Sequence, residues 1–159
     1  MTDHRIVVGV DGTDGGRRAL RWAVHEAATR GGTVQAVMSW RWDTDDETAV
    51  AGSGTGGSGR ERAEQTLRTE IADQTGAVPS TAAIAVAAEV VEGRAAQVLV
   101  EAARDADLLV LGSHGHDRVY RTVLGSVAQE VVEAAPCPVV VIPAAWTGPG
   151  LPAVPAVPR

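Results

Sequence analysis

The residues best suited to chemistry are glycines and a serine in one stretch between a short apolar run and a helix-like pattern. Gly112 and Gly115 begin this stretch, and Gly125 and Ser126 end it. Glycine lets the backbone turn its N–H groups inward and adopt positive φ, so a loop of this kind can wrap a phosphate group. Ser126 and Gln129 have the spacing of a capping box, which predicts a helix N-terminus where anions bind. The alternative is that these glycines are only turn residues.

Ser113 and two histidines in the same stretch suggest two other chemistries. Ser113 follows an apolar run and resembles the serine of a nucleophile elbow, but the elbow needs a small residue where Leu111 stands, and no suitable order of acid and histidine follows. His114 and His116 resemble a metal-binding pair, yet no carboxylate stands at ligand spacing. We interpret the histidines as N–H donors of the loop and expect no metal site.

Composition limits the class of protein. The chain has 159 residues, a one-domain length, and 45% of them are hydrophobic. Its formal net charge of −6 disfavours nucleic acid and anionic membranes as partners, because both require clustered basic surface. The sequence contains no lysine, which excludes a Walker-type phosphate lysine and a Schiff-base lysine.

Cysteine usage and the distribution of apolar residues bear on location. The single cysteine, Cys137, permits no internal disulfide and no cysteine-based metal cluster. The start of the chain lacks the pattern of a secretion signal, and no apolar run reaches about 18 residues. These features predict a cytoplasmic protein that does not span a membrane.

Apolar runs alternate with helical patterns along the chain. Hydrophobic periodicity predicts strands at 5–10, 33–40, 81–89, 108–111 and 138–142, and helices at 16–29, 59–74, 94–103 and after Ser126. The first strand, 5–10, is a nearly continuous apolar run, which is typical of a parallel sheet covered on both faces. Alternation of strands and helices predicts an α/β fold with right-handed crossovers and helices on both faces.

Two segments fall outside this pattern. The glycine- and serine-rich composition of residues 41–60 predicts a flexible loop. Gly52, Gly54 and Gly57 have dinucleotide-fingerprint spacing, but no strand immediately precedes them, so we reject that motif. Residues 144–159 are dense in proline and glycine and predict a disordered or extended tail.

The spacing of Gly112, Gly115, Gly125 and Ser126 resembles the nucleotide-binding signature of the universal stress protein family, in its ATP-binding branch. The likeness extends to three further segments, IVVGVDGTDGGRRALRWAVHEA, DADLLVLGSHG and SVAQEVVEAAPCPVVVIP, and covers about residues 4–143. It implies one domain over 1–143 with a Rossmann-like fold, similar to the adenine nucleotide alpha hydrolases, and an open five-stranded parallel sheet in the order 3-2-1-4-5. In this order the ends of the first and fourth strands meet at a crevice where ligands bind.

The resemblance also implies a set of nucleotide-binding residues at this crevice. They are Gly9, Val10, Asp11, Ser39, Gly112, Ser113, His114, Gly115, His116, Gly125, Ser126 and Val127. Arg118 is a further candidate that departs from the family, because small residues often fill its position. Asp11 would face the nucleotide and help to orient Mg²⁺ indirectly, and the backbone of Ser39 would meet the adenine. Arg118, with Arg121, either neutralises phosphate or is simply solvated. The expected cofactor is ATP, with Mg²⁺ as a companion ion.

The resulting hypothesis is a cytoplasmic, dimeric, ATP-binding stress-response protein. Rapid turnover is not expected, because no general base aimed at a γ-phosphate can be identified; slow hydrolysis stays open. The apolar last strand, 138–142, would lie at a sheet edge and pair with a second copy, as the family resemblance implies. The alternatives are a nucleotide-free interaction protein and, with less support, a serine hydrolase that uses Ser113.

Overall fold

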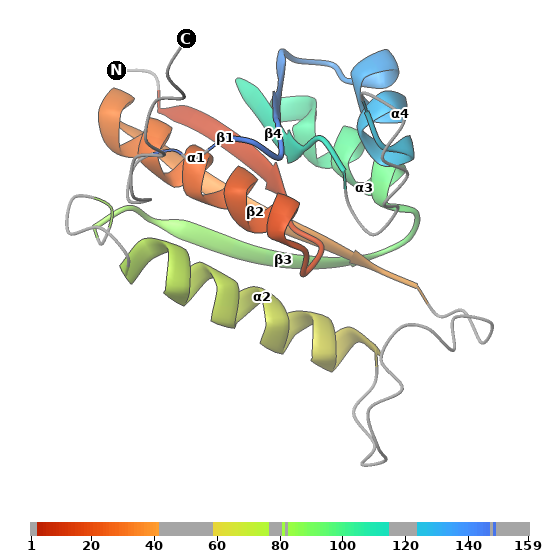
Figure 1. The fold of residues 1–159 in the computed structure, drawn as a ribbon, viewed down its shortest axis with the longest axis horizontal. Coiled ribbons are helices and arrows are strands. Elements are labelled where there is room, and N and C mark those ends of the chain that lie inside the picture. Colours follow the sequence, from red (N-terminus) through yellow and green to blue (C-terminus); the bar gives the residue numbers. More distant parts are fainter. Residues whose placement is uncertain are drawn as a thin grey trace, which may run out of the picture.

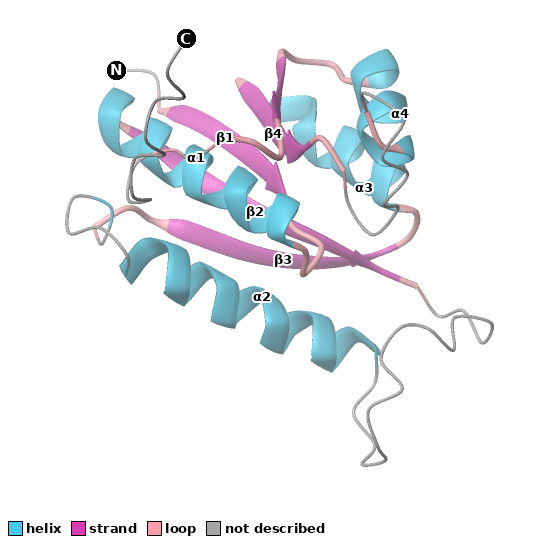
Figure 2. Cartoon of the chain, viewed as in Figure 1, coloured by secondary structure: helices cyan, strands magenta, loops and turns pink. Residues whose placement is uncertain are grey.

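The computed structural model describes residues 3–41, 59–76, 81, 83–114, 124–146 and 148 of the 159-residue chain. The elements in this part follow one another in the order shown in Figures 1 and 2. They are β1 (His4–Gly9), α1 (Asp14–Arg30), β2 (Gly32–Trp40), α2 (Gly59–Gly76), β3 (Val86–Glu92), α3 (Ala95–Ala102), the 3₁₀ turn η2 (Ala103–Asp105), β4 (Leu108–Gly112), α4 (Ser126–Ala134) and β5 (Val139–Ile142).

The strands form one parallel sheet in the order β3-β2-β1-β4-β5. This confirms the predicted α/β class and the strand order 3-2-1-4-5. Ile6 of β1 pairs with Val34 on one side and Leu108 on the other, so β1 lies at the centre. The central strands β1 and β4 are nearly continuous apolar runs because side chains on both faces of the sheet are covered there, whereas β3 at the edge is largely exposed.

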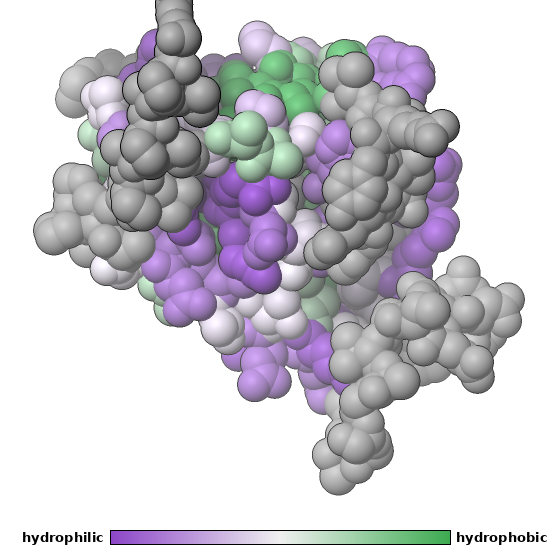
Figure 3. All heavy atoms as spheres, viewed as in Figure 1, coloured by the Kyte–Doolittle hydropathy of each residue, from purple (hydrophilic) through white to green (hydrophobic). Residues whose placement is uncertain are grey.

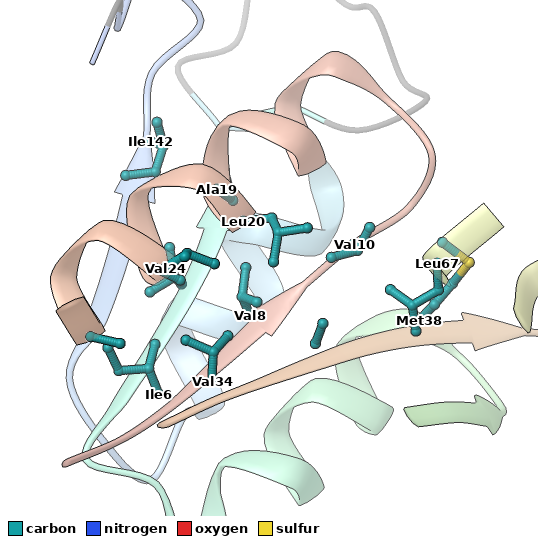
Figure 4. Close-up of a cluster of buried hydrophobic side chains, with 14 residues drawn as sticks. Ile6, Val8, Val10, Ala19, Leu20, Val24, Val34, Met38, Leu67 and Ile142 are labelled. Carbon is teal, nitrogen blue, oxygen red and sulfur yellow. The ribbon is translucent and has the colours of Figure 1, made fainter. Parts of the chain in front are cut away.

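Helices cover the two faces of the sheet in pairs. Ile6 and Val8 point to the face packed against α1 and α2, where they join Leu20 in one buried cluster (Figure 4). Val7 points to the opposite face and packs in a second cluster with Leu99 and other residues of α3 and α4. The alternation along β1 thus divides the core into two layers, as the period of two in a strand requires.

Local sequence accounts for both ends of α1. Thr13 is the N-cap, and its hydroxyl accepts a hydrogen bond from the N–H of Gly16 at 3.3 Å. Gly31 ends the helix with φ of 74°, a left-handed conformation that glycine adopts without steric cost, and its N–H donates to the carbonyl of Ala27 at 2.9 Å. The predicted start at residue 16 was two residues late, because Thr13 rather than a glycine caps the helix.

The third strand is the element that the sequence placed least well. We predicted 81–89, but the strand is Val86–Glu92. Thr81 lies in a turn instead, where its carbonyl accepts from the N–H of Ile84 at 3.1 Å. The apolar run alone does not fix where a strand starts. The ladder with β2, from Val34↔Val86 to Trp40↔Glu92, sets the register.

Most of the expected loop and tail falls outside the described residues. Residues 42–58 of the loop lie there, whereas Gly59 and Arg60 already belong to α2. Trp146, at the start of the expected tail, is half-buried and packs against the core cluster on the α1 face. For the rest of that tail, the disordered or extended state stays a prediction.

Candidate functional site

The turn after β1 and the end of β4 touch through their backbones. A Cβ built on Gly112 would lie 2.8 Å from the carbonyl carbon and oxygen of Gly15, and one built on Gly15 would lie 2.5 Å from the carbonyl oxygen of His114. Both positions therefore require glycine. The ends of the first and fourth strands lie side by side, as the strand order implied.

This contact gives Gly112 a different role from the one that its spacing suggested. We expected its freedom of φ to help wrap a phosphate, but its closest neighbour is the backbone of Gly15. Gly15 itself was missed as a site residue. The three glycines between residues 11 and 16 were the available signal, since such a run permits close backbone approach.

The turn after β1 satisfies its own polar groups. The Asp11 carboxylate accepts hydrogen bonds from the N–H of Thr13, at 3.0 Å, and from the Thr13 hydroxyl. Gly12 has φ of 80°. Val10 is buried, and its N–H donates to the carbonyl of Val37 in β2 at 2.9 Å. In this structure Asp11 thus orients the residue that caps α1.

Gly9 lies under α3 rather than in an open crevice. A Cβ at Gly9 would come within 2.9 Å of a Leu99 methyl group. Ser39 is half-buried near the carboxyl end of β2, where it pairs with Val91 of β3. Both residues are at the same edge of the sheet as the turn after β1, because parallel strands end together.

Ser113 fastens the two ends of the loop that joins β4 to α4. Its N–H donates to the carbonyl of Ile142 in β5 at 3.0 Å, and its carbonyl accepts from the N–H of Gly125 at 2.7 Å. Its hydroxyl lies 3.1 Å from Nδ1 of His114. The residue is only 8% exposed, unlike the displayed serine of a nucleophile elbow, so the geometry adds no support to the hydrolase alternative.

The start of α4 differs from the predicted capping box. Gly125 is the N-cap and makes no side-chain cap hydrogen bond, while Ser126 is the first helical residue and is exposed. The N–H of Gln129 donates to the carbonyl of Gly125 at 3.0 Å. The prediction of Ser126 as the cap was wrong by one residue. The positive end of α4 still faces the loop, with Val127 38% exposed beside it.

Three of the predicted site residues, Gly115, His116 and Arg118, lie outside the described residues. In the described part of the chain, no three or more His, Cys, Asp or Glu residues are grouped to hold a metal ion. The helices that the structure describes include none long and apolar enough to cross a membrane.

A groove of about 550 Å³ borders the turn after β1 on the side of α2. Its lining comes from Gly12 and Arg17 on one side and from Arg62, Gln65, Thr66, Thr69, Glu70 and Asp73 on the other. Burial raises the pKa of Glu70 above the ordinary carboxyl value, and Arg17 only partly offsets this effect.

Comparison with known proteins agrees with this architecture. The sequence model of the Universal stress protein family matches residues 3–143. The chain belongs to the universal stress protein family. It is 33% identical over 139 residues to the universal stress protein in the QAH/OAS sulfhydrylase 3′ region of Thermus aquaticus, a match that covers 86% of this chain and 96% of that protein.

A longer relative shows that the domain also occurs in larger chains. Universal stress protein Rv2624c of Mycobacterium tuberculosis is 31% identical over 147 residues, covering 89% of this chain but 48% of the relative. The chain thus spans about half the length of such relatives.

Two solved universal stress proteins that resemble this chain are complexes with a nucleotide. One, in complex with cAMP, is 25% identical with a TM-score of 0.64, covering 89% of this chain and 98% of that one. The other, from Archaeoglobus fulgidus in complex with dAMP, is 26% identical with a TM-score of 0.61, covering 89% and 99%.

Proposed function

We propose that this universal stress protein binds an adenine nucleotide, ATP in the first instance, across the ends of β1 and β4. The observation that carries the proposal is the backbone contact of Gly15 with Gly112 and His114, which brings the two connections together at the switch point of the sheet. The related structures with cAMP and dAMP favour adenine as the base.

The start of α4 would receive the phosphates. Its N-cap is a glycine without a side chain to cap the helix, so the first N–H groups and the helix dipole favour an anion there. Gly125, Ser126 and Val127 supply these groups, and the family resemblance adds Gly115 and His116. Arg118, which departs from the family pattern, would add a positive charge for the phosphates.

The other predicted residues would hold the base and ribose side of the nucleotide. Gly9 is the last residue of β1, and Val10 and Asp11 follow it. Ser39 is near the end of the neighbouring strand. The Asp11 carboxylate already orients Thr13. We therefore expect the phosphates of the nucleotide to bind Mg²⁺, and Asp11 to help orient the ion only indirectly.

The proposed role is a cytoplasmic stress response that depends on nucleotide occupancy, without rapid turnover. No residue in the described part of the site is identified as a general base for γ-phosphate transfer. A nucleotide-free interaction protein is the alternative, and the binding experiment below separates the two.

We also propose a homodimer formed along β5, the strand at one edge of the sheet. Its residues Val139, Val140 and Val141 are half-buried, and Figure 3 shows hydrophobic surface gathered at the top of the view, where β5 lies. The carbonyl of Pro138 accepts from the N–H of Leu109 in β4, and that of Ile142 accepts from the N–H of Ser113, directly after β4. The peptide groups of Val139 and Val141 therefore point to the opposite edge. An open apolar edge favours pairing with a second copy.

Light scattering tests the dimer. The wild type should have twice the monomer mass at micromolar concentration, and Val141→Pro, which removes an outward N–H group, should shift the mass towards the monomer. A wild type that is monomeric throughout would contradict the proposal.

The nucleotide is identified by denaturing the purified protein and analysing what it releases. Chromatography with mass spectrometry should find near-stoichiometric adenine nucleotide from the wild type and much less from Ser126→Asp, which places a negative charge at the start of α4. Ser126→Ala is the control without charge. An empty wild type that also fails to bind added ATP would favour the interaction protein instead.

A further inference from the structure

Arg17 joins α2 to the turn after β1. Its Nη1 donates to the carbonyl oxygen of Gly12 at 3.0 Å and to Oε1 of Glu70 at 3.2 Å, and its Nη2 lies 3.3 Å from a carboxylate oxygen of Asp14. α1 and α2 lie side by side on the same face of the sheet (Figure 1). A single guanidinium thus connects a side chain of α2 to the backbone of the turn.

The burial of Glu70 is unusual for a carboxylate. The residue is 6% exposed, and its Oε2 has no hydrogen-bond partner in the described part of the chain. Burial raises the pKa of Glu70 more than the nearby Arg17 lowers it. The Arg17 side chain is half-exposed, so the pair recovers only part of what burial of the Glu70 carboxylate costs. Stability is therefore a poor explanation for the pair. What the pair secures is the position of the Gly12 carbonyl.

A second bridge between the same helices provides an internal comparison. Nε of Arg21 donates to Oε1 of Gln74 at 2.9 Å, four residues further along each helix. This bridge also fastens α1 to α2, but it lies one turn further from the strand ends. Breaking one bridge or the other therefore distinguishes an effect of helix packing from an effect of the contact with the turn.

The turn that Arg17 holds is the one that contacts β4. Gly15 lies against the backbone of Gly112 and His114 so closely that neither glycine tolerates a Cβ. A displacement of Gly12 would move Gly15, and the end of β4 would have to adjust, since packed backbones do not deform continuously.

We propose that Glu70 and Arg17 are positioning residues for the nucleotide site, because they hold the Gly12 carbonyl and with it the turn that packs on the end of β4. The inference rests on the proposed nucleotide binding. Neither side chain touches the nucleotide in this account; the effect passes through the backbone of residues 12–15.

The test compares four variants by thermal unfolding and by calorimetric titration with ATP. Glu70→Ala and Arg17→Ala should weaken ATP binding by about fivefold or more. Glu70→Gln keeps an acceptor for Arg17 and should bind nearly as well as the wild type. Gln74→Ala breaks only the second bridge, so it should lower the melting temperature without changing the affinity.

Two titration results would overturn the positioning role. One is an unchanged affinity in folded Glu70→Ala and Arg17→Ala, and the other is an equal loss of affinity in Gln74→Ala, because general helix packing would then explain the effect.

Amide hydrogen exchange separates failure of this inference from failure of the proposed function. Without any ligand, residues 11–16 should exchange faster in Glu70→Ala and Arg17→Ala than in the wild type, and at the wild-type rate in Gln74→Ala. Unchanged exchange in the first two variants would overturn the positioning role itself. Faster exchange combined with no ATP binding by the wild type would instead overturn the nucleotide function.

Discussion

Two strand-to-helix connections meet at the same edge of the sheet, and they start their helices in opposite ways. The connection from β1 to α1 is short, and Thr13 caps the helix while Asp11 holds Thr13. The connection from β4 to α4 is longer, and its helix starts at Gly125, which has no side chain to act as a cap. The first connection thus caps its helix with its own side chain, whereas the second starts its helix at a glycine, which is the basis of the anion site proposed above.

Arg17 adds to this difference. It donates to the Gly12 carbonyl in the first connection and ties it to α2 through Glu70. The second connection is tied at its ends by Ser113, whose peptide groups bind Ile142 and Gly125. Under the proposed function, the first connection would be the rigid side of the site and the second would supply the groups that bind the nucleotide.

The largest predicted effect comes from filling the contact between the two connections. Gly112→Ala would place a Cβ 2.8 Å from the Gly15 backbone, so it should lower the free energy of unfolding by about 3 kcal/mol. Gly76→Ala is the control, because a Cβ there meets nothing within 4 Å. Denaturant unfolding measures both. Equal stability of the two variants would show that the connections do not press on one another.

The next effect concerns the cap of the first connection. Thr13→Ala removes the hydroxyl that accepts from Gly16 and donates to Asp11, and should cost about 1 to 2 kcal/mol in the free energy of unfolding. Thr13→Ser keeps both hydrogen bonds and should recover most of the loss. If alanine and serine variants were equally stable, the cap would not be what makes this connection rigid.

A smaller effect should appear as a pH dependence of stability. Burial raises the pKa of Glu70, Asp11, Asp73 and Asp14 add to the rise, and Arg17 opposes it. With a raised folded-state pKa, the stability contributed by Glu70 is fully present below the ordinary carboxyl pKa and is lost as pH rises through the folded value. Glu70→Gln stays uncharged and should lack this component.

Melting curves of the wild type and Glu70→Gln between about pH 4 and about pH 8 measure this pH-dependent component of stability. The melting temperature of Glu70→Gln relative to the wild type should increase with pH across this interval by a few degrees. A difference in melting temperature that stays constant with pH would mean that burial does not raise the pKa of the Glu70 carboxyl.

The smallest effect is expected at the start of the second connection. Ser126→Asp places a negative charge in the first turn of α4, which has no acidic residue of its own. The first turn of α1, by comparison, already carries Asp14. It should raise the free energy of unfolding by about 0.5 kcal/mol at low salt through the helix dipole. Thermal unfolding of Ser126→Asp and Ser126→Asn checks the sign. A loss of stability in the aspartate variant would mean that this helix end does not favour an anion.

Much of the fold was predictable because the spacing of apolar residues within a short segment indicates a helix or a strand. The buried stripe of α1, with Leu20, Ala23, Val24 and Ala27, follows from spacings of three and four along one helix. The position of β3 was not predictable in the same way, because its start is set by pairing with β2 and not by its own apolar run. The order of strands came from the family resemblance.

The candidate site was predictable only in part. The sequence indicated Gly112 and the start of α4, and the glycine run between residues 11 and 16 was a signal for Gly15 that was missed. The Arg17–Glu70 pair appears only when residues far apart in the chain are brought together. Glu70 stands three residues after Leu67 on the buried face of α2, but its charge argues against burial, and its partner Arg17 lies 53 residues away in the sequence. The role of each predicted residue in nucleotide binding stays a prediction.

Calorimetric titration of ATP into nucleotide-free protein, with Ser126→Asp and Ser126→Ala in parallel, tests the central claim most directly. We predict one ATP per chain in the wild type, similar affinity in Ser126→Ala, and at least about tenfold weaker binding in Ser126→Asp, because the added carboxylate replaces the phosphate at the start of α4. Absence of binding in the wild type, or equal binding by the aspartate variant, would contradict the account.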